Sequence, residues 1–316
     1  MILLPRTKPH TLPQLESLLP RLDPKDSIYP VLKNIKHRLE SGYAGEKSLD
    51  YFYEILDLQP FPILHNLRLK NNDKYFQIDT LILFNNFFLI IEVKNYSGII
   101  RYNPDSSLLV REGDNGKLER FSDPFIQAQI QRNHLASFLR KHNLPAIPIH
   151  TLIVFSHQAA ILEFSRHIPD MIVSQKLLDR VPELRKQYGS KIYSNQQLVT
   201  IGKLLAGASE PQKDRVIDIY SISHNRIKNG VWCTGCRNEM MVRERRNWLC
   251  PICFHRDRKA HIPALQDYKW IFGPEITNEK ARTFLGVPSR WIIKNLLKRS
   301  GLTQIGVKSK TKYIIP

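Results

Sequence analysis

Residues 75–94, YFQIDTLILFNNFFLIIEVK, contain two apolar runs on either side of the pair Asn85–Asn86. Asparagine tolerates positive φ, so a two-residue turn at this pair predicts a β-hairpin. In that register the numbers of paired residues sum to 171. Asp79 then lies directly opposite Glu92.

The two carboxylates of this hairpin share one face, which is otherwise lined by apolar side chains, because side chains alternate along a strand. At a non-hydrogen-bonded position their Cβ atoms come within about 4.5–5.5 Å of each other. Like charges repel at that distance unless a cation lies between them. Lys94 is two residues after Glu92 and points from the same face. The hairpin therefore predicts a metal site beside a lysine.

The composition is that of a folded protein with an uneven charge. The chain has 316 residues, 42% of them hydrophobic, which is enough for two or three domains. Its formal charge is +18, and 19 Lys/Arg against 6 Asp/Glu place +13 in residues 226–316. A basic C-terminal third indicates a polyanionic partner, nucleic acid first, although a merely soluble basic surface stays open.

Targeting signals are not evident. The N-terminus, MILLPRTKPH, lacks the pattern of a signal peptide. No stretch approaches the roughly 18–20 apolar residues of a membrane span. All four cysteines lie in CxxC pairs, which in a reducing compartment indicate a metal site and not disulfides. We expect a cytoplasmic protein with no membrane partner.

Periodicity and composition predict five segments along the chain. Apolar spacing over residues 29–58 predicts two helices separated at Gly42, with Glu46 in the first turn of the second helix. The predicted segments are an irregular N-terminal segment (1–28), an α/β domain (29–205), a linker (206–230), a cysteine module (231–256) and a helical C-terminal module (257–316).

Four short motifs follow one another over residues 40–155. They are Gly45-Glu46, Gln77-Ile78-Asp79, Glu92-Val93-Lys94 and Pro124-x-x-Gln127. In this order the chain resembles the NERD (nuclease-related) domain, a branch of the PD-(D/E)XK nuclease-like superfamily. The resemblance implies a restriction-endonuclease-like α/β core, a mixed sheet flanked by helices.

The acidic residues suit phosphodiester hydrolysis. A hard divalent cation polarises the phosphate and lowers the pKa of a bound water, and Mg²⁺ (or Mn²⁺) prefers oxygen ligands. Asp79 and Glu92 are the expected ligands, and the resemblance implies the Val93 carbonyl as a third. Lys94 is expected to orient the attacking water or offset charge developing on the phosphate.

Two further residues complete the predicted catalytic set. Glu46 is expected to anchor a second metal ion or a metal-bound water. Gln127 matches the glutamine of the family and is expected to position the nucleophile or the phosphate. Each has a plainer alternative: Glu46 as a solvated carboxylate at a helix start, and Gln127 as a surface residue.

The cysteine module is expected to bind zinc. Two CxxC pairs with a 13-residue spacer are typical of a tetrahedral zinc ribbon, whose complete shell makes the metal structural. The predicted ligands are Cys233, Cys236, Cys250 and Cys253. Between the pairs, cationic and aromatic side chains suit phosphate and base contacts, or form a solvated hairpin tip; these are Arg243, Arg245, Arg246 and Trp248.

The C-terminal segment has the signals of a helix, a turn and a helix. Thr277 and Ser289 can cap the two helices, and Gly286 can turn the chain between them. Together with a following β-hairpin, these elements predict a helix-turn-helix-like or winged-helix-like DNA-binding unit. Arg290 and Lys294 are its candidate contacts. A helical hairpin for packing or dimerisation is the alternative, so a homodimer stays open.

Taken together, these features predict a metal-dependent nuclease with Mg²⁺ or Mn²⁺ at the acidic site and structural Zn²⁺ in the ribbon. DNA is favoured over RNA as the substrate. Two alternatives stay open: a non-catalytic DNA-binding protein that uses an inactive nuclease fold, and an RNA-processing factor.

Overall fold

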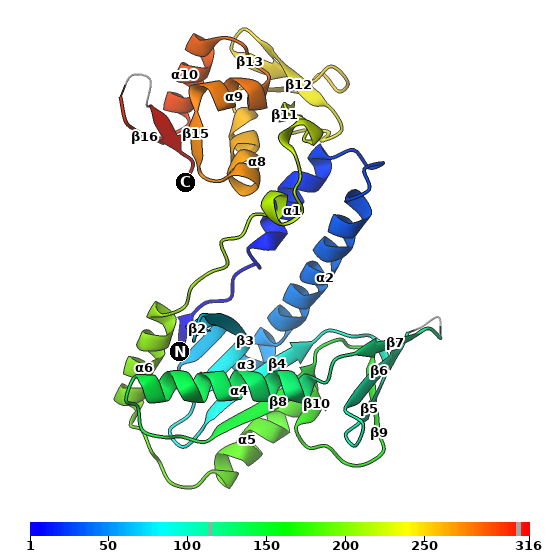
Figure 1. Cartoon of the computed structure of the whole chain (residues 1–316), viewed down its shortest axis with the longest axis vertical. Coiled ribbons are helices and arrows are strands. Elements are labelled where there is room, and N and C mark those ends of the chain that lie inside the picture. Colours follow the sequence, from blue (N-terminus) through cyan, green and yellow to red (C-terminus); the bar gives the residue numbers. More distant parts are fainter. Residues whose placement is uncertain (114–115, 308–310) are drawn as a thin grey trace. The chain divides into compact units, whose positions relative to one another are not determined.

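The computed structural model describes residues 1–113, 116–307 and 311–316. Its internal contacts divide the chain into two compact units (Figure 1). The first comprises Met1–Lys8 and Arg38–Pro211, and the second comprises Pro9–His37 and Gln212–Pro316. Across these described residues, no helix is both long enough and apolar enough to cross a membrane.

A mixed six-stranded sheet forms the centre of the first unit. Its strands, in order across the sheet, are β1 (Ile2–Leu4), β2 (Ile63–Asn71), β3 (Lys74–Leu83), β4 (Phe88–Lys94), β8 (Ile149–Phe155) and β10 (Met171–Val173). Strands β2, β3 and β4 pair antiparallel, and the other neighbours pair in parallel. The predicted α/β class, a mixed sheet flanked by helices, is confirmed.

Helices and a second sheet complete the first unit. The helices are α2 (Tyr29–Ser48, whose first residues belong to the second unit), α3 (Asp50–Ile55), α4 (Pro124–Lys141), η2 (Ser174–Lys176), α5 (Leu177–Gln187) and α6 (Asn195–Gly207). The second sheet has the order β7 (Leu118–Phe121), β6 (Leu108–Glu112), β5 (Gly98–Asn103) and β9 (Ala160–Phe164). Helix α4 lies across one face of the central sheet (Figure 1). Pro124 opens α4, and the Asp123 carboxylate caps it by accepting from the Phe125 N–H at 2.8 Å.

The hairpin β3–β4 has the predicted register, from Leu83 opposite Phe88 to Thr80 opposite Ile91. The predicted cause of its turn is wrong, because neither Asn85 nor Asn86 has positive φ. Instead, the Asn85 side chain donates to the Tyr193 carbonyl oxygen at 2.7 Å, and the Asn86 side chain donates to the Tyr188 carbonyl oxygen. The asparagines bind the chain that passes beside the turn.

Two expectations about the N-terminal part are corrected. Helix α2 continues through Gly42, so Glu46 lies in its last turn and not in the first turn of a second helix. Residues 1–28 are not irregular, since they contain β1, α1 (Thr11–Leu18) and η1 (Leu19–Arg21). Strand β1 pairs in parallel with β2, and helix α1 packs against the C-terminal part of the second unit.

The second unit joins the cysteine module and the C-terminal segment in one hydrophobic core. Trp248 and Cys250 from the module share this core with Leu265 and Phe284. Its remaining elements are α7 (Val216–Ile219), η3 (His224–Arg226), β11 (Val231–Trp232), β12 (Met240–Glu244), β13 (Asn247–Leu249), β14 (Arg256–Asp257), α8 (His261–Phe272), β15 (Glu275–Thr277), α9 (Asn278–Leu285), α10 (Arg290–Arg299), β16 (Thr303–Ile305) and β17 (Lys312–Ile314). The two modules are therefore one folded body.

Local chemistry sets the ends of the C-terminal helices as predicted. The Thr277 hydroxyl accepts from the Lys280 N–H at 3.2 Å, and the Ser289 hydroxyl accepts from the Ile292 N–H at 3.3 Å. Gly286 ends α9 with φ 67°. The strands order as β15-β17-β16, so the predicted β-hairpin is formed by β16 and β17, and residues 308–310 between them lie outside the described residues.

Within the second unit, Arg21 joins the N-terminal helices to the C-terminal part of the chain. Its side chain is fully buried, and its guanidinium donates to Asp267 Oδ2 at 2.7 Å and to the carbonyl oxygens of Lys228 and Gly230 at 3.1 Å each. It also lies 4.6 Å above the centre of the Phe284 ring. One side chain thus satisfies three acceptors from two segments of the chain.

Replacing Arg21 by methionine is expected to lower the free energy of unfolding of the second unit by about 3 kcal/mol, because one carboxylate and two carbonyl groups lose their donor. All four tryptophans lie in residues 212–316, so urea denaturation followed by tryptophan fluorescence reports this unit selectively. Arg21→Lys, which keeps the charge but not the fork of donors, should lose less. An unchanged midpoint in Arg21→Met would contradict the role of this side chain.

Candidate functional site

Four elements of the first unit bring together three predicted acidic residues and the predicted glutamine. Glu46 comes from the last turn of α2, Asp79 from β3, Glu92 from the end of β4, and Gln127 from the first turn of α4. Helix α2 approaches β4 closely because Gly45 has no side chain. A Cβ atom there would lie 2.5 Å from Asn95 Cβ and 2.6 Å from Ser156 Oγ.

Glu92 is the most strongly hydrogen-bonded acid of the site and is only 2% exposed. Its Oε1 accepts from Lys94 Nζ at 2.7 Å and from Gln127 Nε2 at 2.6 Å. Its Oε2 accepts from Gln131 Nε2 at 2.8 Å. Lys94 Nζ also donates to Gln127 Oε1 at 3.0 Å, so the lysine, the glutamine and the carboxylate form one network. Gln131 was not predicted, although it follows Gln127 by one helical turn and so lies on the same face of α4.

Lys94 is cationic in this network. Burial by itself would lower the pKa of Lys94, but the charge and the hydrogen bond of Glu92 outweigh burial and raise it above its ordinary value.

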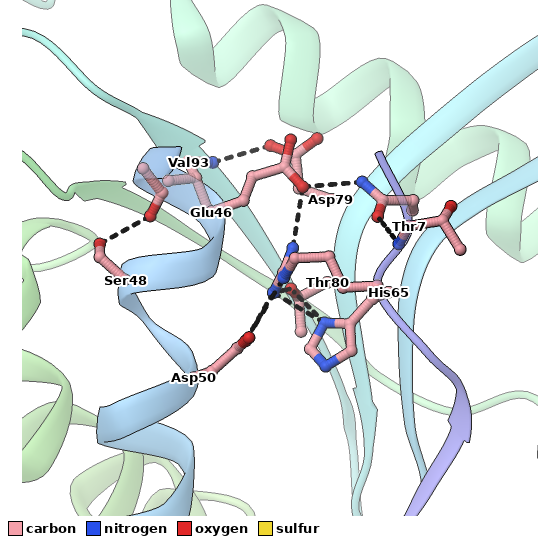
Figure 2. Close-up of polar contacts among 11 residues, drawn as sticks. Thr7, Glu46, Ser48, Asp50, His65, Asp79, Thr80 and Val93 are labelled. Atoms are coloured by element: carbon pink, nitrogen blue, oxygen red, sulfur yellow. Dashed lines mark hydrogen bonds and ion pairs between the residues drawn. The ribbon is translucent and has the colours of Figure 1, made fainter. Parts of the chain in front are cut away.

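Asp79 lies beside Glu92 and beside Glu46. Its Oδ2 accepts from the Val93 N–H at 2.9 Å, which ties β3 to β4 beyond the last paired residues of the hairpin. Burial, followed by the charges of Glu92 and Glu46, raises the pKa of Asp79 well above its ordinary value. Figure 2 shows the Glu46 and Asp79 carboxylates close to each other. An acid in this position favours a bound cation or a proton.

Glu46 is held by two residues that were not predicted. Its Oε2 accepts from Arg6 Nη1 at 2.8 Å and from Asn66 Nδ2 at 2.7 Å. Burial raises the pKa of Glu46, while Asn66 and Arg6 oppose that rise. Neither partner carried a local signal, because Arg6 precedes Glu46 by forty residues and no motif contains Asn66.

The donor set fits a hard divalent cation. Three mutually interacting carboxylates meet beside the end of β4, and each carboxylate oxygen has two acceptor positions, so the bonds described above leave room for a metal. Oxygen ligands from Asp79 and Glu92 are those that Mg²⁺ and Mn²⁺ prefer. Among the described residues, the ligand atoms of the four cysteines all lie within 4.8 Å of one another, whereas those of the three carboxylates lie farther apart.

The four cysteines of the second unit form a compact cluster. All their sulfurs lie within 4.8 Å of one another, with 3.6 Å between Cys233 and Cys253 and 3.8 Å between Cys236 and Cys250. Four sulfurs at about 2.3 Å from a tetrahedral zinc ion would be about 3.8 Å apart. The cluster therefore fits a possible structural zinc site.

Backbone N–H groups favour the thiolate form of Cys233. Burial opposes ionisation of Cys233, but the N–H groups of Cys236 and Gly235 each donate to its sulfur at 3.4 Å and lower its pKa to about 6. Thiolate is the form that ligates a metal.

The predicted aromatic contact of this module is wrong. Trp248 is 1% exposed and lies in the core, so it is not available to stack on a base. Arg243 is partly buried above the Trp248 ring, 5.2 Å from its centre. Arg245 and Arg246 are exposed at the turn between β12 and β13.

A basic groove of about 910 Å³ lies along α9, α10 and the C-terminal hairpin. Arg290 and Lys294 line it, as do Arg282 and Lys298. Trp291, which is 73% exposed, lines the same groove and was not predicted as a contact. A cationic groove with an exposed aromatic ring can bind phosphates and stack on a base.

One of the comparisons with known proteins gives a match, and it covers the segment that contains the predicted acidic residues. No curated protein and no solved structure gives a significant match to the chain. Residues 41–156 match the model of the nuclease-related domain, and this range contains Glu46, Asp79, Glu92 and Gln127. Residues 41–156 of this chain are therefore a NERD (nuclease-related) domain.

Proposed function

We propose that the chain is a metal-dependent nuclease that hydrolyses phosphodiester bonds in DNA. The observation that supports this most is the meeting of Asp79, Glu92 and Lys94 with Gln127 at one end of the β3–β4 hairpin. The match to the nuclease-related domain independently supports nuclease chemistry.

Each residue of the acidic site has a role in this proposal. Asp79 and Glu92 would hold Mg²⁺ or Mn²⁺, with the Val93 carbonyl as a further ligand. When bound, the ion would supply Lewis acidity toward the phosphate and toward water. Lys94, oriented by Glu92 and Gln127, offers its ammonium group to the attacking water or to the negative charge that grows on the phosphate oxygens. Gln131 holds Glu92 from the opposite oxygen.

The second unit supplies nucleic-acid binding in this proposal. The succession of α8, β15, α9, α10 and a C-terminal hairpin resembles a winged helix, and in this proposal α10 would be the recognition helix. Its Arg290 and Lys294 line the basic groove together with the exposed Trp291. We propose that the zinc-binding module supports this unit, with Arg245 and Arg246 as additional phosphate contacts.

Removing the basic side chains of α10 is expected to weaken DNA binding. Arg290→Ala and Lys294→Ala each take away one cation that faces a phosphate, and each should reduce the slope of log K against log salt concentration by about 0.9. Fluorescence anisotropy with labelled duplex between low and moderate salt measures this slope. Lys203→Ala, at an exposed position of α6, is the matched control. Equal slopes for wild type and both variants would argue against the groove.

A panel of labelled substrates tests the function itself. Single-stranded DNA, duplex DNA, nicked duplex, branched DNA and RNA are incubated with the zinc-loaded full chain, with and without added Mg²⁺. The proposal expects Mg²⁺-dependent products from at least one DNA substrate. Binding without cleavage in every case would favour a non-catalytic DNA-binding protein, and cleavage of RNA alone would favour an RNA-processing factor.

A further inference from the structure

Arg6 is a buried cation within the acidic site, although it lies 35 residues before the segment that matches the nuclease-related domain. Its side chain is 5% exposed. The parallel pairing of β1 with β2 carries the chain to this place, as Ile2 pairs with Ile63 and Leu4 pairs with Leu64. The segment that follows β1 therefore places the Arg6 side chain at the end of the sheet at which Glu46 lies.

The guanidinium of Arg6 is fixed on several sides. Nη1 donates to Glu46 Oε2 at 2.8 Å, while Nε and Nη2 donate to Asp50 Oδ1 at 3.3 and 3.1 Å. Nη2 also lies 2.9 Å from His65 Nδ1 and 3.4 Å from Thr80 Oγ1. Figure 2 shows Asp50, the first residue of α3, facing His65 and Thr80.

His65 can act as an acceptor in this arrangement. Burial, and then the charge of Arg6, lower the pKa of His65 to about 4, so the ring is neutral near pH 7. A neutral imidazole can accept through Nδ1 and adds no competing positive charge. Arg6 is thus the fixed cation in this part of the site, since a guanidinium does not lose its proton in proteins.

Asn66, whose side chain makes the second contact with Glu46, has an unusual backbone conformation. Its φ is 48°, a left-handed conformation that asparagine adopts more readily than most residues. Its flanking residues keep regular pairing with β3, as His65 pairs with Thr80 and Leu67 pairs with Ile78. The Thr7 N–H donates to Asn66 Oδ1 at 3.4 Å, which orients the amide so that its NH₂ group faces Glu46.

The charges of the site balance with a single divalent ion. When a bound cation keeps all four acids ionised, Glu46, Asp50, Asp79 and Glu92 carry four negative charges, and Arg6 and Lys94 carry two positive charges. The remainder is −2, the charge that one Mg²⁺ or Mn²⁺ neutralises. Because Arg6 and Asn66 both occupy Glu46 Oε2, that oxygen already has its cationic partner.

We propose that Arg6 is a positioning residue that holds Glu46 and takes the place of a second metal ion, so that the acidic site binds one divalent cation per chain. This inference rests on the proposed nuclease site. It assigns to the N-terminal strand a part of the site that the matched domain does not contain.

Calorimetric titration of the zinc-loaded full chain with Mn²⁺ tests the inference without relying on cleavage. The wild-type protein is expected to bind one Mn²⁺ per chain, and Asp79→Asn is expected to remove that binding. Arg6→Gln leaves an additional negative charge on the site and should admit a second Mn²⁺. Arg6→Lys, which retains the charge, should restore a stoichiometry of one, and Arg120→Gln, at an exposed position, is the matched control.

Two Mn²⁺ ions bound at the acidic site of the wild-type protein would overturn the inference without any Arg6 variant, so the test does not depend on how Arg6→Gln folds. An unchanged stoichiometry in a folded Arg6→Gln protein would also overturn it. If instead no Mn²⁺ binds to the wild-type protein in a manner that Asp79→Asn removes, the proposed function fails together with the inference. If one Mn²⁺ binds but DNA is not cleaved, the role of Arg6 stands and the nuclease proposal alone fails.

Discussion

Asp79→Asn and Glu92→Gln are each expected to lower the rate of Mg²⁺-dependent DNA cleavage by about 10³-fold or more. A bound metal ion contributes several kcal/mol to stabilising the charged transition state, and each 1.36 kcal/mol corresponds to a factor of ten in rate. Each variant removes one ligand charge with almost no change in side-chain volume. Single-turnover cleavage of an end-labelled DNA substrate measures the loss.

The two substitutions differ in the number of hydrogen bonds that they disturb. Glu92 accepts from three donors, which contact both of its carboxylate oxygens. In Glu92→Gln, the new NH₂ group would therefore face at least one of these donors. Asp79 accepts only from the Val93 N–H among the hydrogen bonds described above, so Asp79→Asn is the gentler change. Glu54→Gln, at an exposed position of α3, is the matched control. Full activity in Asp79→Asn, with a normal far-ultraviolet circular dichroism spectrum, would refute the assignment of the site.

Removing zinc is expected to unfold the second unit and to leave the first unit folded. Zinc binding by four thiolates contributes about 10–16 kcal/mol in small zinc modules, which is as much as the whole stability of an ordinary domain. In this chain the effect should spread beyond the module, because Cys233, Cys250 and Trp248 lie in the core that the C-terminal helices share.

The tryptophans give this experiment a selective signal. All four lie in the second unit, at positions 232, 248, 270 and 291. Chelation should release about one zinc ion per chain, shift the tryptophan emission to longer wavelength and leave most of the far-ultraviolet circular dichroism of the first unit. Cys250→Ser should reproduce the shift without a chelator. A zinc-free protein with native tryptophan emission would contradict the structural role of the metal.

The parts of the fold that the sequence predicts correctly are set by neighbours along the chain. The register of β3–β4 follows from alternation, and the ends of α9 and α10 follow from Thr277, Gly286 and Ser289. Spacing also predicts the cysteine cluster, because two CxxC pairs bring their thiolates together once a hairpin forms.

The errors arise where distant residues decide the conformation. Gly42 does not end α2, because one glycine costs a helix only about 1 kcal/mol and packing elsewhere outweighs it. The turn at Asn85 and Asn86 is in the predicted place, but side-chain hydrogen bonds to residues about a hundred positions later stabilise it. Trp248 closely follows three arginines in the sequence and yet lies in the core.

The same reason explains which site residues were missed. Arg6 and Asn66 reach Glu46 only after β1 and β2 have paired, and no spacing rule connects these three positions. Gln131 could have been found, since it is four residues after Gln127 on one helix face. Motifs thus locate the proposed ligands of the site, whereas the residues that hold those side chains come from the tertiary structure.

Cleavage of DNA by the purified, zinc-loaded full chain, measured side by side with and without added Mg²⁺, tests the central claim most directly. The proposed site predicts products from wild type with Mg²⁺, none without Mg²⁺, and none from Asp79→Asn in either condition. DNA that is bound but remains intact in Mg²⁺, or that is cleaved equally by wild type and Asp79→Asn, would contradict it.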